Sequence, residues 1–120
     1  MFTLGIIEES LASMDVLDSL RPYLFSQRME EIPGDAVPVW HTNEYHLPAE
    51  ALSGFLPTLE QNVLPSWYVH AFNDDCLLVI LSGKTFTVSQ TRDHTWDDMI
   101  AYGESVQVER RFLENIPLRV

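Results

Sequence analysis

The spacing of apolar residues along the chain predicts alternating strands and helices. Alternation of apolar and polar residues, or a run rich in β-branched and aromatic residues, is typical of strands. Six segments fit this pattern: residues 2–8, 23–32, 37–47, 67–72, 76–81 and 85–89. Apolar residues three and four positions apart predict helices over residues 14–20, 48–63 and 95–103, and the tail is expected to add one helical turn around Phe112.

Prolines, glycines and capping residues mark where these elements end. Pro22 is expected to stop the first helix, because the residue before a proline is pushed out of the α region. Pro48 sits where the second helix would begin, and Pro57 predicts either a kink or two short helices that abut. Gly83 is expected to take the positive φ at the first central position of a type II′ hairpin, and Thr95 is expected to cap the last helix.

The resulting order, β-α-β-β-α-β-β-β-α, predicts an α+β fold in a single domain over residues 1–120. Its first six elements match the ferredoxin-like βαββαβ pattern, in which an antiparallel sheet carries both helices on one face. A β-hairpin and a C-terminal helix are appended to that start. Because the 120 residues contain no repeat and no Gly/Ser linker, they are interpreted as one folding unit.

The segment from Cys76 to Leu81 is apolar at every position, unlike a strand that turns one face to water. Leaving its alternate large side chains exposed would forfeit about 1.5–3 kcal/mol each, so both of its faces are expected to be buried. Two covers are open: the helix around Trp96, or a second copy of the chain. Because ferredoxin-like domains often pair through their open sheet face, we expect a homodimer.

The charge and cysteine content exclude several classes of partner. The chain carries 18 acidic and 7 basic residues, a formal net charge of −11, and nucleic acids and anionic membranes are therefore not expected as partners. The only cysteine, Cys76, leaves no intramolecular disulfide and no cysteine-based zinc site. The first residues lack the basic head of a signal peptide, and no apolar run approaches the ~20 residues that span a bilayer, so a cytosolic location is expected.

No cofactor and no metal site is predicted. His41 and His46 are five residues apart in a predicted strand, so they point to opposite faces and do not form a zinc pair. The Gly-Lys-Thr sequence at residues 83–85 is similar to the end of a phosphate-binding loop, but the glycine required five residues earlier is Leu78. A strand follows it rather than a helix, so the sequence is interpreted as a hairpin turn.

The candidate chemistry lies in residues 67–75. Strand alternation places Tyr68, His70 and Phe72 on one face. His70 would move a proton, Tyr68 would hydrogen-bond a substrate, and Asp74 or its neighbour would orient the imidazole. In the alternative interpretation, Tyr68 and His70 fill the interior with their polar tips on backbone partners, while the aspartates build a turn. The alternative is preferred because intermediate burial is usual for both residue types.

This stretch, with the apolar strand and the Gly-Lys-x-Phe turn that follow it, resembles a group of small stand-alone prokaryotic hypothetical proteins of unknown function. The resemblance covers mainly residues 66–104. It implies a compact cytosolic α+β domain, and it implies no activity.

Two functions fit the sequence. The first is a self-associating binding or interaction module that holds a small molecule or a protein on an aromatic sheet face. The residues of that face are Trp40, Trp67, Phe72 and Asp74. The second is a small-molecule enzyme that uses His70 as a general acid or base together with Tyr68, in a pocket between sheet and helix. We expect the first of these two functions.

Overall fold

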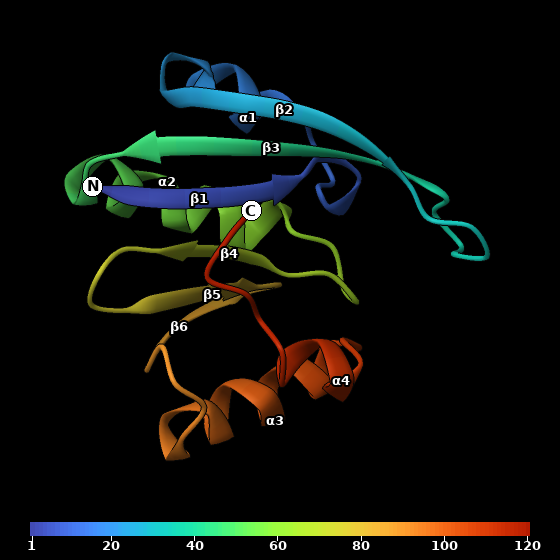
Figure 1. Cartoon of the computed structure of the whole chain (residues 1–120), viewed down its shortest axis with the longest axis vertical. Coiled ribbons are helices and arrows are strands. Elements are labelled where there is room, and N and C mark those ends of the chain that lie inside the picture. Colours follow the sequence, from blue (N-terminus) through green and yellow to red (C-terminus); the bar gives the residue numbers. More distant parts are fainter.

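A six-stranded antiparallel sheet forms the centre of the computed structural model, which describes residues 1–120 (Figure 1). The strands are β1 (Phe2–Ile7), β2 (Leu24–Glu31), β3 (Val39–Leu47), β4 (Val69–Phe72), β5 (Leu77–Leu81) and β6 (Lys84–Val88). The helices are α1 (Asp15–Leu20), α2 (Ala49–Asn62), α3 (Asp97–Ser105) and α4 (Arg110–Leu113), and the short 3-10 helices are η1 (Glu8–Ser10), η2 (Arg21–Tyr23) and η3 (His94–Trp96). The α+β class predicted from the sequence is confirmed.

The strands lie in the order β2-β3-β1-β4-β5-β6, and every neighbouring pair is antiparallel. Along the chain, β1-α1-β2-β3-α2-β4 comes first, and the hairpin β5–β6 and the helices α3 and α4 follow. Each predicted strand and helix is present, and α4 is the helical turn expected around Phe112. The ferredoxin-like assignment of the first six elements stays a prediction. The longest helix, α2, has 14 residues, and no helix is long and apolar enough to cross a bilayer.

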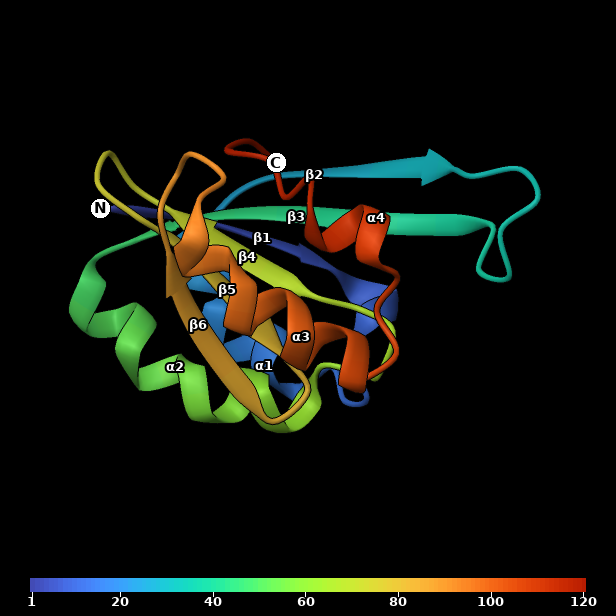
Figure 2. The same cartoon turned by 90° about the horizontal axis from the view of Figure 1, so that it is seen from below.

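One face of the sheet packs against α1 and α2 (Figure 2). Alternate residues of β1, among them Leu4 and Ile6, are buried on this face beside Tyr45 of β3. Leu52 and Leu59 of α2 are seven positions apart, so they lie on the same side of the helix and are both buried in this core. The α1–α2 face is therefore closed to solvent along the middle of the sheet.

The opposite face is covered over β4, β5 and β6 by α3 and α4. Trp96 and Met99 of η3 and α3 are buried in a second core with Val79 of β5. A Cβ at Gly103 of α3 would lie only 2.6 Å from a methyl carbon of Leu113, so the absence of a side chain there lets α4 pack closely on α3.

Strand β5 is shielded on both faces by its own chain. Ile80 lies in the core under α1 and α2, while Val79 and Leu81 lie in the core under α3 and α4, and all three are fully buried. The helix around Trp96 is therefore the cover of the second face. A homodimer was expected because the second face of this strand needed a cover, and the chain's own helices supply it.

Two predictions about caps and turns are wrong. Leu81 pairs with Lys84, so Gly83 is the second and not the first central residue of the β5–β6 turn, where it has a φ of 91°. Asp93, rather than Thr95, is the N-terminal cap of η3, since its carboxylate accepts a hydrogen bond from the backbone N–H of Thr95 at 2.9 Å.

The prolines act partly as predicted. Helix α1 ends at Leu20, and Pro22 follows within the 3-10 helix η2. Pro48 is the cap of α2 and lies one position before its first helical residue. Helix α2 continues through Pro57, so the alternative of two short helices is wrong.

Two segments frame the part of the second face that α3 and α4 leave open. The β2–β3 hairpin extends well beyond the other strands, and the C-terminal segment, defined here as residues 116–120, runs from α4 across β4 to β1 (Figures 1 and 2). Val120 ends against Gly5 of β1. The open region between hairpin and C-terminal segment holds the candidate site.

Candidate functional site

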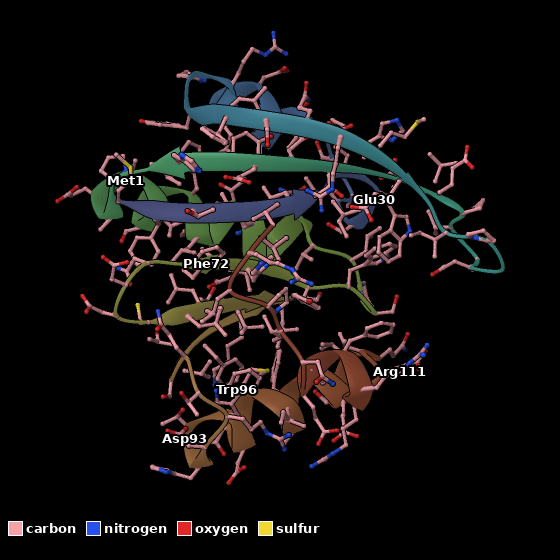
Figure 3. The ribbon with its side chains drawn as sticks, in the orientation of Figure 1. Met1, Glu30, Phe72, Asp93, Trp96 and Arg111 are labelled. Atoms are coloured by element: carbon pink, nitrogen blue, oxygen red, sulfur yellow. The ribbon has the colours of Figure 1, made fainter.

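A cavity of about 450 Å³ lies on this sheet face, bounded by the β2–β3 hairpin, β1, the start of β4, the turn between α3 and α4, and the C-terminal segment. Pockets for small organic ligands have volumes of roughly 300–1,000 Å³. In Figure 3, Glu30 on the hairpin and Arg111 on α4 lie toward the same end of the molecule, while Phe72 lies toward the other end. Glu30 lines the cavity and the other two residues do not.

His70 stands at the cavity wall with one of its ring nitrogens already engaged. Its Nε2 lies 2.9 Å from the backbone carbonyl oxygen of Arg119, and because a carbonyl only accepts, Nε2 carries the proton and donates. The side chain is only 8% exposed, and burial lowers the pKa of His70, with the hydrogen bond to Arg119 acting in the opposite direction. The ring is therefore neutral at neutral pH, with Nδ1 as its basic atom.

Aromatic neighbours hold the His70 ring on both sides. Phe72 stacks on it with ring centroids 5.9 Å apart, and Tyr68 meets it edge-on at 6.0 Å. Tyr68 and Phe72 also pack against the α3–α4 core, and burial raises the pKa of the Tyr68 phenol. The predicted sharing of one strand face agrees with the positions of His70 and Phe72 in β4, while Tyr68 precedes the strand and keeps its place beside the ring.

Gly5 makes room for this arrangement. It pairs with His70 across the β1–β4 ladder, and a Cβ there would lie 2.9 Å from His70 Cε1 and 2.8 Å from Val120 Cγ2. Contacts this short do not occur for real side chains, so only glycine lets the imidazole and the C-terminal segment both lie flat on β1. The glycine thereby positions His70 and the last residues of the chain together.

Two indole rings form another wall of the cavity. Trp40 comes from β3 and Trp67 from the segment before β4, and their ring centroids are 5.3 Å apart at an interplanar angle of 65°. Trp40 Nε1 donates to the carbonyl of Val37 at 2.8 Å, which fixes its ring, while Trp67 Nε1 has no hydrogen-bond partner. The pair offers an apolar surface with one indole N–H free to donate.

Thr42 is the unsatisfied member of the cavity wall. It lies on β3 two residues after Trp40, hence on the same face, and is 6% exposed. Its Oγ1 is the only buried side-chain nitrogen or oxygen in the protein without a hydrogen-bond partner. Leaving a buried hydroxyl unpaired costs about 1–3 kcal/mol. A hydrogen bond from a bound ligand would remove this cost.

The charged residues of the cavity wall differ in whether they already have partners. Glu30 accepts from Arg28 at 2.7 Å, and Glu109 accepts from Arg111 at 2.8 Å. The Asp35 carboxylate accepts from the backbone N–H of Val37 at 3.0 Å. By contrast, the guanidinium of Arg119, a wall residue in the C-terminal segment, makes no ion pair and no hydrogen bond.

The residues predicted to form a ligand face separate into two groups. Trp40 and Trp67 come together at the cavity, and His70 and Tyr68 also line it. Phe72 is a packing partner of the His70 ring and does not reach the cavity.

The aspartates of the β4–β5 turn do not reach the site. The turn is built by Asn73, whose side-chain oxygen accepts from the N–H groups of Asp75 and Cys76, both at 2.9 Å. Asp74 lies in the same turn and does not line the cavity. In the enzyme interpretation an aspartate would orient the imidazole, and that part is wrong. The partner is the backbone carbonyl of Arg119, 49 residues away in the chain, so the preferred interpretation, with the polar tip of His70 on a backbone partner, is confirmed for this residue.

Sequence reasoning missed Gly5, Thr42 and Arg119. None of the three belongs to a motif, and nothing local distinguishes them from other residues of their type. The alternation of β3 does put Thr42 on the face of Trp40, and this was the one signal that could have pointed to it.

Two histidine–carboxylate pairs lie outside the cavity. His41 Nδ1 lies 2.6 Å from Glu9 Oε2, and His46 Nε2 lies 2.6 Å from Glu44 Oε2. The hydrogen bond with Glu9 raises the pKa of His41. No three His, Cys, Asp or Glu side chains are grouped so that they could hold a metal ion.

Comparison of the chain with protein-family models, with curated proteins and with solved structures finds no match. The geometry of the cavity is therefore what bears on function.

Proposed function

We propose that the protein is a cytosolic binding module that holds a small organic molecule in the cavity between the sheet, the β2–β3 hairpin and the C-terminal segment. The observation that carries the proposal is the unpartnered, buried Oγ1 of Thr42, which is a residue of the cavity wall. A ligand that hydrogen-bonds to this hydroxyl would remove its desolvation penalty, while the rings of Trp40 and Trp67 would cover the apolar part of the ligand. The cytosolic location rests on the sequence.

The proposal does not include self-association. A homodimer was expected in order to cover the second face of β5, and α3 and α4 cover that face. A protein ligand on the aromatic face is likewise less well supported than a small molecule, because Trp40 and Trp67 lie in a concave wall rather than on a flat surface.

The test replaces the unsatisfied hydroxyl with a methyl group of the same shape. In Thr42→Val the free protein is expected to gain about 1 kcal/mol in unfolding free energy, because no hydrogen bond is lost and an unpaired polar group is removed. The same change is expected to weaken binding of small aromatic acids, amides or amines, measured as backbone amide shifts by NMR.

Thr87→Val is the matched control, since Thr87 is exposed on β6 and remote from the cavity. It is expected to leave both stability and binding nearly unchanged. The proposal fails if no compound of the panel shifts the amides around the cavity, or if Thr42→Val binds the panel as well as the natural chain does.

A small-molecule enzyme is the second candidate, and one observation favours it. The hydrogen bond to the carbonyl of Arg119 fixes the His70 tautomer, so Nδ1 has a free lone pair and the lowered pKa keeps it unprotonated at neutral pH. Such an atom is a competent general base. The buried, ring-stacked setting of His70 equally suits a structural role, and the stability of a His70 variant separates the two, as argued at the residue scale below.

A further inference from the structure

We propose that the cavity selects a flat monocarboxylate, an aromatic or heteroaromatic acid, whose carboxylate is bound by the guanidinium of Arg119. The inference rests on the proposed function and names the chemical class of its ligand.

The first argument is the balance of unused hydrogen-bonding groups in the wall. The three carboxylates there, Glu30, Asp35 and Glu109, already accept hydrogen bonds from groups of the protein. The wall side chains that make no hydrogen bond in the protein can mostly donate: the guanidinium of Arg119, the indole N–H of Trp67, the amide of Gln107, and the hydroxyls of Thr42, Ser66 and Tyr68. The free atoms that only accept are His70 Nδ1 and the second oxygen of each carboxylate. A ligand that pairs with these donors must therefore offer acceptors.

The second argument is charge. Arg28 also lines the cavity, but its guanidinium is neutralised by Glu30 at 2.7 Å. Arg119 is thus the one cation of the wall without a counter-charge, and an arginine binds a carboxylate through two parallel N–H···O bonds. A protein of net charge −11 repels multiply charged anions. One free guanidinium in that field suits a monoanion and disfavours phosphates and nucleotides.

The third argument is shape. Trp40 and Trp67 present ring surfaces 5.3 Å apart at 65°, a corner in which a flat ring can contact one indole face and the other indole edge. The main-chain carbonyl of Arg119 is anchored by His70 at 2.9 Å, so the base of its side chain is fixed at the cavity edge. An aromatic ring in the corner and a carboxylate toward the C-terminal segment use both features at once.

The test compares three probes with the same aromatic ring: benzoate, its neutral isostere benzamide, and the cation benzylamine. Binding is followed in the full chain by NMR, using the indole N–H signals of Trp40 and Trp67 as reporters. Benzoate is expected to bind about tenfold more tightly than benzamide, as a charge-assisted hydrogen bond would give, and benzylamine more weakly than either. The benzoate preference is expected to shrink as salt is added.

Arg119→Gln is expected to reduce the ratio of benzoate to benzamide affinity to about one. The side chain of Arg119 is exposed and the hydrogen bond to His70 uses its main chain, so this variant keeps the fold. Arg21→Gln is the control of equal charge change, since Arg21 is exposed and pairs with Asp18 away from the cavity. It is expected to retain the full preference.

The outcomes separate the inference from the proposed function. Equal binding of the three probes, preference for benzylamine, or a benzoate preference that survives Arg119→Gln would each overturn the carboxylate assignment and leave a binding cavity in place. No response of the cavity signals to any of the probes would contradict the proposed function itself.

Discussion

At the scale of single residues, the site depends on contacts that span the length of the chain. His70 donates to the carbonyl of Arg119 and lies against Gly5, so one imidazole joins β4, β1 and the C-terminal segment. Because the ring is buried, its charged form is disfavoured and it acts as a neutral hydrogen-bond donor. Thr42 shows the opposite case, a buried polar group that the fold leaves without a partner.

The titration of His70 gives a prediction about pH. The folded-state pKa lies below the ordinary value of 6.5, so the unfolded chain takes up the proton first as the pH falls, and folding stability is lost below about pH 6.5. His70→Gln removes this titration while its amide can still donate to Arg119. The stability advantage of the natural chain over this variant is expected to be larger at about pH 7.5 than at about pH 5.5.

Urea unfolding at both pH values measures this difference, and the other three histidines are common to both proteins. At neutral pH the variant is expected to lose about 1 kcal/mol or more, because the stacked ring between Tyr68 and Phe72 is gone. Unchanged stability at neutral pH would instead favour the enzyme candidate, since a catalytic histidine is usually replaced with little effect on folding.

At the scale of elements, β5 and α3 depend on each other. The uniformly apolar run of β5 needs two covers, and η3 and α3 need an apolar surface for Trp96, Met99 and Ile100. Gly103 then lets α4 approach, which leads the chain back over the sheet and places the C-terminal segment at the cavity. The second core is thus what positions one wall of the site.

This dependence predicts a large effect of one truncation. Leu81→Ala is expected to lower the unfolding free energy by about 2–5 kcal/mol, because Leu81 is fully buried under α3 and α4. Leu118→Ala, at a leucine that is 43% exposed, is the control and should change stability by less than about 0.5 kcal/mol. Chemical denaturation of both variants measures this. Similar losses in the two would contradict the second core.

At the scale of the whole molecule, both faces of β5 are covered by one chain. A second copy is not needed to bury β5, and we expect a monomer of 13.8 kDa in sedimentation experiments. The remaining apolar surface on the sheet is on the edge strand β2, where Phe25 and Met29 are exposed. A dimer that Phe25→Lys dissociates would contradict this expectation and would show that the free edge pairs.

The sequence by itself determined the elements and their burial, because both follow from local periodicity. The apolar run of β5 and the stripe of α3 indicated where the interior lies, and the alternation over residues 67–72 placed Tyr68 and His70 on one face. The sequence did not predict that Asp93 is the cap or that Gly83 is the second central residue of its turn, because competing capping residues and turn registers differ little in local free energy.

Only the tertiary structure decided what covers β5 and what surrounds His70. The cover of β5 depends on how α3 and α4 pack on it. The surroundings of His70 depend on how the C-terminal segment returns to β1, a contact between residues more than a hundred positions apart that no local pattern encodes. The hydrogen-bond partner of His70, the carbonyl of Arg119, also comes from this distant segment. Thr42 and Arg119 likewise line the cavity because distant segments pack together there. Periodicity reports which side of an element is buried, and the packing of distant segments determines which polar groups remain without a partner.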